Sequence, residues 1–118
     1  MIDLVNVQHN VPAGRVIPVQ VDTVDPVEIG PGVHYRELPG TGHIRPWVID
    51  IAPGAEWPEL DVHTTYGEVY FVVSGEVIEG DRRYGPGSYL FFEPDTAHRP
   101  RSETGARAFG FNYDPPAR

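Results

Sequence analysis

Short runs of alternating apolar and polar residues follow one another along the chain, and most of them end at a glycine or a proline. An alternation with a period of two predicts β-strands, because successive side chains of a strand point to opposite faces. The runs cover residues 33–38, 44–51, 68–73, 76–79, 82–84, 88–92 and 106–113. About nine short strands with frequent turns are typical of an antiparallel barrel or jelly roll. The pattern therefore predicts an all-β fold, a jelly-roll barrel.

The N-terminal part of the chain carries the weakest strand pattern. Residues 16–21 alternate only weakly and contain Pro18, which has no amide hydrogen to donate to a sheet, so they form at best an edge strand. No repeat or linker divides the 118 residues, a length that fits one domain with one core. We expect a single domain over residues 1–118, with an irregular or edge arm over 1–30 and the barrel over 31–114.

Composition removes several classes of function. The chain has no cysteine, which excludes disulfides, thiolate metal sites and thiol nucleophiles. Its formal net charge of −8 disfavours nucleic acids and anionic membrane surfaces as partners. The first 15 residues lack the basic start and apolar run of a signal peptide, and no stretch is long and apolar enough to span a bilayer. We expect a cytoplasmic protein whose partner is a small molecule.

Four side chains of the central region are candidate metal ligands. Asp61 and His63 are two residues apart, so they share one face of an extended segment, and Glu68 begins the next strand. His98 follows a Gly-rich turn and can approach from a separate strand. Imidazoles and carboxylates together suit a borderline or hard divalent cation such as Fe, Mn, Zn or Ni. The spacing therefore predicts a metal site on the inner face of the barrel.

The same residues resemble the two motifs of the cupin superfamily. In the first cupin motif a glycine precedes two histidines one residue apart, and a glutamate and a second glycine follow; here Asp61, His63, Glu68 and Gly75 occupy the positions after Gly54. The second motif corresponds to Gly-Pro-Gly-Ser at 85–88 and to Pro-Asp-Thr-Ala-His at 94–98. The resemblance implies a cupin-like double-stranded β-helix and carries the metal-ligand role to His63, Glu68 and His98.

Two positions depart from the cupin pattern. Asp61 stands where the family usually has its first histidine, and Ser102 stands where the second motif often ends in asparagine. Asp61 matches a metal ligand by position only, so it is either a fourth ligand or an acceptor that orients a histidine. Residues 85–105 are similar to the cupin domain of ChrR-type anti-sigma factors. The zinc-binding helical domain of those proteins has no counterpart here, so this similarity supports the barrel and not sigma-factor regulation.

Other polar and aromatic residues are candidates for roles around the metal. Glu68, where it is not a ligand, could move protons, and Tyr70 shares its strand face and could act as an acid or hydrogen-bond donor. Their alternative roles are those of a rim carboxylate and a core aromatic. Aromatic side chains and one guanidinium are the candidates for substrate binding: Arg45, Trp47, Phe92 and Phe111. Each of the four can equally serve the core or the solvated surface.

Three functions of different classes fit this pattern. The first is a metal-dependent enzyme, a dioxygenase, isomerase, cyclase or lyase, acting on a small aromatic or keto-acid molecule by Lewis-acid or oxygenase chemistry. The second is a non-catalytic small-ligand-binding or sensory module that uses the same pocket. The third is a structural domain whose metal site has decayed, which only the aspartate at position 61 suggests. The resemblance to cupins also implies a homodimer that pairs through strand exchange or sheet edges.

Overall fold

The computed structural model describes residues 14–116 of the chain, and this part consists of short strands joined by turns and loops. The predicted all-β class is confirmed, and the only helical element among these residues is a single 3-10 turn, η1 (Val21–Thr23). In the described part of the chain, no helix is long and apolar enough to cross a membrane. The strands are β1 (Val27–Gly30), β2 (Val33–Glu37), β3 (Ile44–Ile51), β4 (Asp61–His63), β5 (Gly67–Gly75), β6 (Val77–Glu79), β7 (Arg82–Tyr84), β8 (Tyr89–Phe92), β9 (Thr96–His98) and β10 (Ala106–Tyr113).

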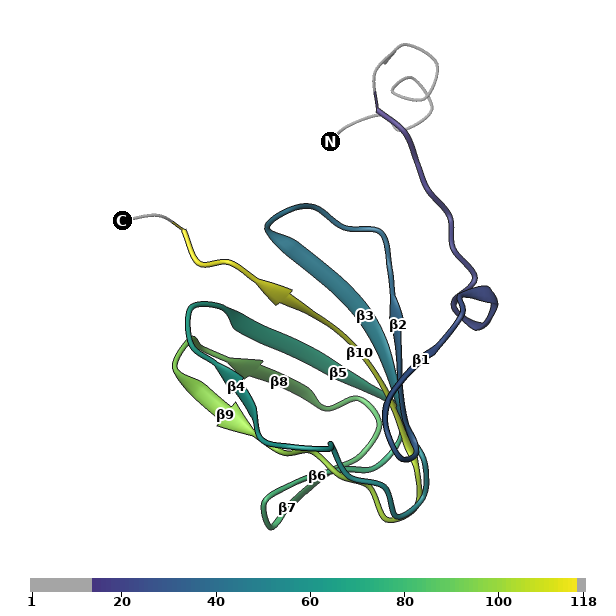
Figure 1. Ribbon diagram of the computed structural model, residues 1–118, viewed down its shortest axis with the longest axis vertical. Helices are drawn as coiled ribbons and strands as arrows, with labels where there is room; N and C mark the ends of the chain where they lie inside the picture. Colours follow the sequence, from purple (N-terminus) through teal and green to yellow (C-terminus); the bar gives the residue numbers. More distant parts are fainter. Residues whose placement is uncertain (1–13, 117–118) are drawn as a thin grey trace.

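One large sheet and two strand pairs make up the barrel. The six-stranded antiparallel sheet has the order β1-β2-β3-β10-β5-β8, and β4–β9 and β6–β7 form the two pairs. Figure 1 shows the large sheet as a curved layer from β1 to β8, with the two pairs gathered toward the β8 end. Strands far apart in sequence are therefore neighbours, because the C-terminal β10 lies between β3 and β5.

The inner faces of the central strands form the hydrophobic core. Alternate residues of β3 are Trp47, Ile49 and Ile51, and all three are buried, as the sequence pattern predicts. On β10, Gly110 lies opposite both Trp47 and Tyr70 of β5. A Cβ atom at Gly110 would lie 2.7 Å from Cη2 of Trp47, so only glycine leaves room there for the indole ring. This arrangement fixes the indole at the inner end of the barrel's cavity.

The N-terminal segment differs from the strand pattern of the sequence. Residues 16–20 have no regular structure and Val21 begins η1, so the weak alternation there does not produce a strand. Pro18 has no amide hydrogen to pair. The edge of the sheet is instead β1, where Val27 lies opposite Tyr35. The predicted arm also includes residues 1–13, which lie outside the described residues.

An ion-pair network joins three strands on the outer side of the sheet. Asp50 of β3 accepts hydrogen bonds from Arg107 of β10, at 2.7 Å from Nε and 3.0 Å from Nη2, and from Arg36 of β2. Burial raises the pKa of the Asp50 carboxyl, but the hydrogen bonds and charges of Arg107 and Arg36 outweigh burial and hold that pKa below its usual value. The ionised carboxylate therefore stabilises the folded sheet.

The lowered pKa of Asp50 predicts a pH-dependent contribution to stability. Since the carboxylate stays ionised in the folded protein to lower pH than in the unfolded chain, its contribution is full above about pH 4 and is lost as pH falls through the folded pKa. We expect Asp50→Asn to lower the free energy of unfolding by about 1–2 kcal/mol at neutral pH. The difference from the parent should shrink in acid. Urea unfolding of both proteins across this range measures it, and a difference that is constant down to the most acidic sample would contradict the prediction.

Candidate metal centre

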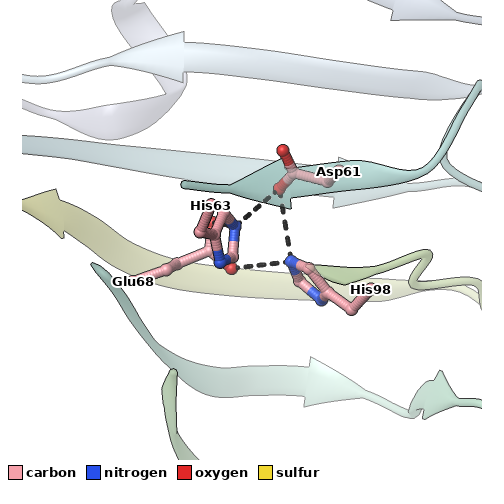
Figure 2. A group of neighbouring side chains, drawn as sticks. All are labelled: Asp61, His63, Glu68 and His98. Carbon is pink, nitrogen blue, oxygen red and sulfur yellow. Dashed lines mark hydrogen bonds and ion pairs between the residues drawn. The ribbon is translucent and has the colours of Figure 1, made fainter. Parts of the chain in front are cut away.

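Three strands bring the four predicted ligands together inside the barrel. Asp61 and His63 come from β4, Glu68 from β5 and His98 from β9. Antiparallel pairing of β4 with β9 places Asp61 directly opposite His98. One donor atom from each of the four side chains lies within 4.8 Å of the others, and Figure 2 shows the four converging on one point. The structure thus forms the cluster that the sequence predicts, and this cluster could hold a metal ion.

The Nε2 atoms of the two histidines face the carboxylate oxygens of Asp61 and Glu68. Nε2 of His63 lies 3.1 Å from Oδ2 of Asp61 and 3.3 Å from Oε1 of Glu68. Nε2 of His98 lies 3.2 Å from the same Asp61 oxygen and 3.0 Å from Oε2 of Glu68. His63 and Glu68 are buried, while Asp61 is partly exposed at the rim. Two imidazoles and two carboxylates therefore surround one point at the barrel mouth.

A threonine fixes which nitrogen of His63 faces this point. The Thr96 hydroxyl donates its hydrogen to the backbone carbonyl of Glu93 at 2.8 Å, so its oxygen is left to accept. Nδ1 of His63 lies 3.1 Å from that oxygen and donates to it. With its hydrogen on Nδ1, a neutral imidazole presents the Nε2 lone pair to the carboxylates. The ring is thereby oriented so that Nε2 could bind a metal ion.

A partly buried glutamate does the same for His98. Nδ1 of His98 lies 2.8 Å from Oε2 of Glu79, which has only acceptor atoms when ionised. The Tyr70 hydroxyl donates to the same oxygen at 2.7 Å. The other oxygen of Glu79, Oε1, is buried and has no hydrogen-bond partner among the described residues. A carboxylate that holds the outer nitrogen of a ligand histidine is a common support of metal sites, because it fixes the ring and raises its basicity.

Glu68 has a support of its own on the opposite side. The side-chain amide of Asn112 donates to Oε1 of Glu68 at 3.3 Å, and its carbonyl accepts from the Trp47 indole at 2.9 Å. These hydrogen bonds link β3, β10 and β5, and they end at the Trp47 indole, for which Gly110 leaves room. The position of the Glu68 carboxylate is therefore set by two neighbouring strands.

The electrostatics of the cluster favour a positive charge at its centre. Burial lowers the pKa of His98, but its hydrogen bonds with Asp61, Glu68 and Glu79 outweigh burial and raise that pKa to about 11. The same balance raises the pKa of His63, chiefly through Glu68. Burial raises the pKa of the Asp61 and Glu68 carboxyls, but hydrogen bonds with the imidazoles hold both below their usual values. A divalent cation between neutral imidazoles and ionised carboxylates would also place a positive charge beside the two carboxylates, so the donor set fits such an ion.

Two cavities adjoin the cluster on its open side. One of about 30 Å³ and one of about 270 Å³ share Trp47, Ile49 and Trp57 as walls, and both reach the carboxylates of Asp61 and Glu68. The larger one is also lined by Ile29, Tyr35, Tyr66 and Asn112. A ligand in this space would reach the centre of the cluster from one side while touching mostly aromatic and aliphatic surface.

The proposed substrate-binding residues occupy different places. Trp47 lines both of these cavities. Phe92 stacks on Tyr70 at 5.7 Å between ring centroids and lines a separate hollow behind His98. Arg45 forms an exposed ion pair with Asp114 at 3.2 Å and lines neither cavity. Phe111 is likewise absent from the walls of both.

Tyr70 lies beside the cluster but directs its hydroxyl away from it. Burial raises the pKa of this phenol well above its usual range, and the negative charge of Glu79 adds to the effect. Its hydrogen is already donated to Glu79. The structure thus gives Tyr70 a role in holding Glu79, and His98 through it.

The supporting residues Glu79, Thr96 and Asn112 were not predicted from the sequence. Asn112 carried a usable signal, because the period of two on β10 places it on the same face as the buried Ala108 and Gly110. Glu79 is likewise in step with the buried Val77. In a strand a polar residue in step with buried ones indicates either an edge or a functional partner.

Comparison with known proteins identifies the fold. No protein-family model matches the chain, and no curated protein matches it in sequence. Among solved structures, it is similar to a predicted oxalate decarboxylase from Thermotoga maritima, with a TM-score of 0.73, 16% identity and coverage of 84% of this chain and 100% of that one. It is also similar to an RmlC-like cupin from Shewanella frigidimarina, with a TM-score of 0.70, 20% identity and coverage of 82% and 89%.

A third similarity concerns the resemblance to anti-sigma factors. The complex of Rhodobacter sphaeroides SigE with the anti-sigma ChrR matches with a TM-score of 0.69 and 22% identity, over 80% of this chain and 51% of that one. These likenesses show that the protein has a cupin fold. The predicted double-stranded β-helix, and the resemblance to the ChrR cupin domain, are confirmed at the level of the fold.

The contact between Glu79 and His98 predicts an effect on metal affinity. Glu79→Ala should weaken binding of Zn²⁺ by about 10- to 100-fold, because the ring of His98 loses the acceptor that orients it. Glu79→Gln should lose less, since an amide oxygen can still accept from Nδ1. Competition with a chelating dye measures both affinities.

A matched variant separates this effect from a general loss of charge. Glu76 lies three residues earlier and forms an exposed ion pair with Arg83, so Glu76→Gln should bind Zn²⁺ like the parent. Parent-like affinity in a folded Glu79→Ala protein would contradict the orienting role of Glu79.

Proposed function

We propose that this protein is a metal-dependent enzyme with a cupin fold that acts on a small organic molecule, aromatic or keto-acid, by Lewis-acid or oxygenase chemistry. The observation that carries the proposal is the cluster itself: four donor atoms within 4.8 Å of one another beside a cavity. Similar folds include one described as a predicted oxalate decarboxylase, which supports an enzymatic role without specifying the reaction.

In this proposal the residues of the cluster bind a cation, and one of their carboxylates also accepts a proton. Asp61, His63, Glu68 and His98 would hold the divalent ion, Fe, Mn, Zn or Ni, which when bound would polarise a substrate oxygen or activate dioxygen. Both imidazoles approach Asp61 through Oδ2, and Figure 2 shows its other oxygen pointing away from the cluster. That free oxygen of a partly exposed carboxylate is suited to accept a proton from a substrate. Glu68 is buried and held by Asn112, which favours a ligand role for it over proton transfer.

The alternative is a small-ligand-binding or sensory module without turnover. It is supported by the number of protein donors, because four ligands leave fewer exchangeable positions on the ion than three do. The structural similarity to the complex of an anti-sigma protein points the same way. A ligand that raises the melting temperature of the metal-loaded protein, with no product formed, would favour this alternative.

Metal content and turnover together test the proposed enzyme. The purified protein, reconstituted with each of the four metals, should take up about one ion per chain by mass spectrometry. His63→Ala and His98→Ala should abolish this uptake, since each removes a ligand, while His43→Ala should retain it, because that side chain is exposed. Oxygen uptake and product formation are then assayed with phenols, diketones and keto acids. A folded parent that takes up none of the four metals would rule out the proposal.

We also propose that the whole chain, residues 1–118, is one cytoplasmic domain that forms a homodimer through the outer face of its large sheet. Phe71 of β5 lies between Phe109 of β10 and Tyr89 of β8, and all three are exposed by 42% or more. A continuous apolar row of this kind is uncommon on a monomer and typical of an interface.

The dimer can be tested at the middle of this row. Light scattering of the parent should give twice the 13.1 kDa of the chain, and Phe71→Arg should give the single-chain mass because it places a charge in the contact. Val62→Arg, on an exposed residue of the separate β4–β9 pair, should remain dimeric. A parent protein that is monomeric at all concentrations would exclude this interface.

A further inference from the structure

The walls of the cavity beside the metal centre are mainly rings and aliphatic side chains. Trp47 and Trp57 line both adjoining spaces, and Tyr35 and Tyr66 line the larger one together with Ile29. Aromatic walls favour a flat ligand that can stack or meet their edges. Away from the carboxylates of the cluster, the polar groups on residues that line the larger cavity are the two tyrosine hydroxyls, the two indole N–H groups and the amide of Asn112.

Basic side chains are kept away from this space. All nine basic residues of the chain are arginines, and none of those in the described part lines either cavity. Arg45 lies over the Tyr66 ring at 5.8 Å, and its charge is paired with that of Asp114. Most of the others form ion pairs elsewhere, in pairs such as Arg36–Asp50, Arg83–Glu76, Arg99–Glu56 and Arg107–Asp50.

The charge balance of the centre therefore limits the charge of a ligand. The two carboxylates of the cluster cancel the charge of one divalent cation when the imidazoles are neutral. A dianion bound to that cation would meet no further positive side chain in the cavity, in a protein whose net charge is already −8. Charges that are buried without a partner are costly. A neutral or singly charged ligand avoids this cost.

The size of the cavity agrees with a ring. Its larger part measures about 270 Å³, and a cavity of about 150 Å³ is enough to bind benzene. A chelating ligand can place two adjacent oxygens at the cluster while its ring lies among the indoles. Small aliphatic acids such as oxalate would leave this apolar surface unused.

From this geometry, and resting on the proposed function, we infer that the site takes planar aromatic chelators, neutral or singly charged, of the phenol, catechol or enolised-ketone class. Small aliphatic dicarboxylates are disfavoured. Trp57 is the main specificity-determining residue, because it lines both cavities and none of its side-chain atoms forms a hydrogen bond to the cluster. The ligand class thus differs from the one suggested by the name of the similar Thermotoga maritima protein.

Two matched chelators test the inference directly. Tropolone and oxalate each bind a metal through two oxygens in a five-membered ring, but tropolone is a flat monoanion and oxalate a dianion. Their affinities for the zinc-loaded protein are measured by calorimetry, and the same ratio is measured for zinc nitrilotriacetate, a chelate without a pocket. The ratio of the affinity for tropolone to that for oxalate should be about tenfold or more higher at the protein than at zinc nitrilotriacetate. One or two good aromatic contacts would produce a difference of this size.

Two variants then locate the effect in the cavity wall. Trp57→Leu should lower the affinity for tropolone several-fold and leave that for oxalate unchanged, whereas the control Phe91→Leu, at an exposed position of β8, should change neither. Ile29→Arg places a cation in the same wall and should raise the affinity for oxalate. Because Ile29→Arg is expected to gain affinity for oxalate, partial unfolding, which can only lower affinity, could not mimic its result.

The outcomes separate this inference from the function on which it rests. If zinc binds and the ratio at the protein equals that of zinc nitrilotriacetate, or favours oxalate, the ligand class is wrong while the metal centre stands. If Trp57→Leu weakens both chelators equally, the indole does not determine specificity and the inference fails. If the folded protein takes up no zinc or other metal, the proposed function and the inference fail together.

Discussion

The position of two hydrogens determines how this site behaves. Thr96 and Glu79 each accept from the Nδ1 atom of a histidine, which leaves both Nε2 atoms facing Asp61 and Glu68. Because both nitrogens face two carboxylates, the centre favours a positive charge. Protonated imidazoles supply that charge, and a divalent ion between neutral imidazoles could supply it in their place.

The barrel makes this arrangement rigid by drawing each support from a different strand. Glu79 comes from β6 and Thr96 from β9, while Asn112 and Trp47 extend from β10 and β3 to Glu68. No ligand relies on its own strand alone for its orientation. A preorganised donor set of this kind holds a cation with little rearrangement, and it leaves the cavity side of the centre open to a small molecule.

Positive and negative side chains lie in different parts of the molecule. Arginines pair with Asp50 on the outer surface of the sheet, whereas no arginine of the described residues lines the two cavities beside the cluster. Folds of this kind are found in proteins described as a predicted oxalate decarboxylase and as an anti-sigma complex, so the fold alone does not specify chemistry. The two cavities beside the cluster have largely aromatic and aliphatic walls.

The sequence by itself predicted the all-β class from local alternation, and it predicted the four-residue cluster from that alternation together with the resemblance to the cupin motifs. A period of two places Asp61 and His63 on one face, and turn residues set where Glu68 and His98 begin or end their strands. The weaker alternation at residues 16–20, which allowed at best an edge strand, gives no strand, and these residues pair with no strand in the described part of the chain. Only the tertiary structure decided what supports the cluster, since Glu79 and His98 are 19 positions apart and meet across separate strand pairs. Alternation determines the face on which a side chain lies, whereas strand order and register determine which side chains it meets.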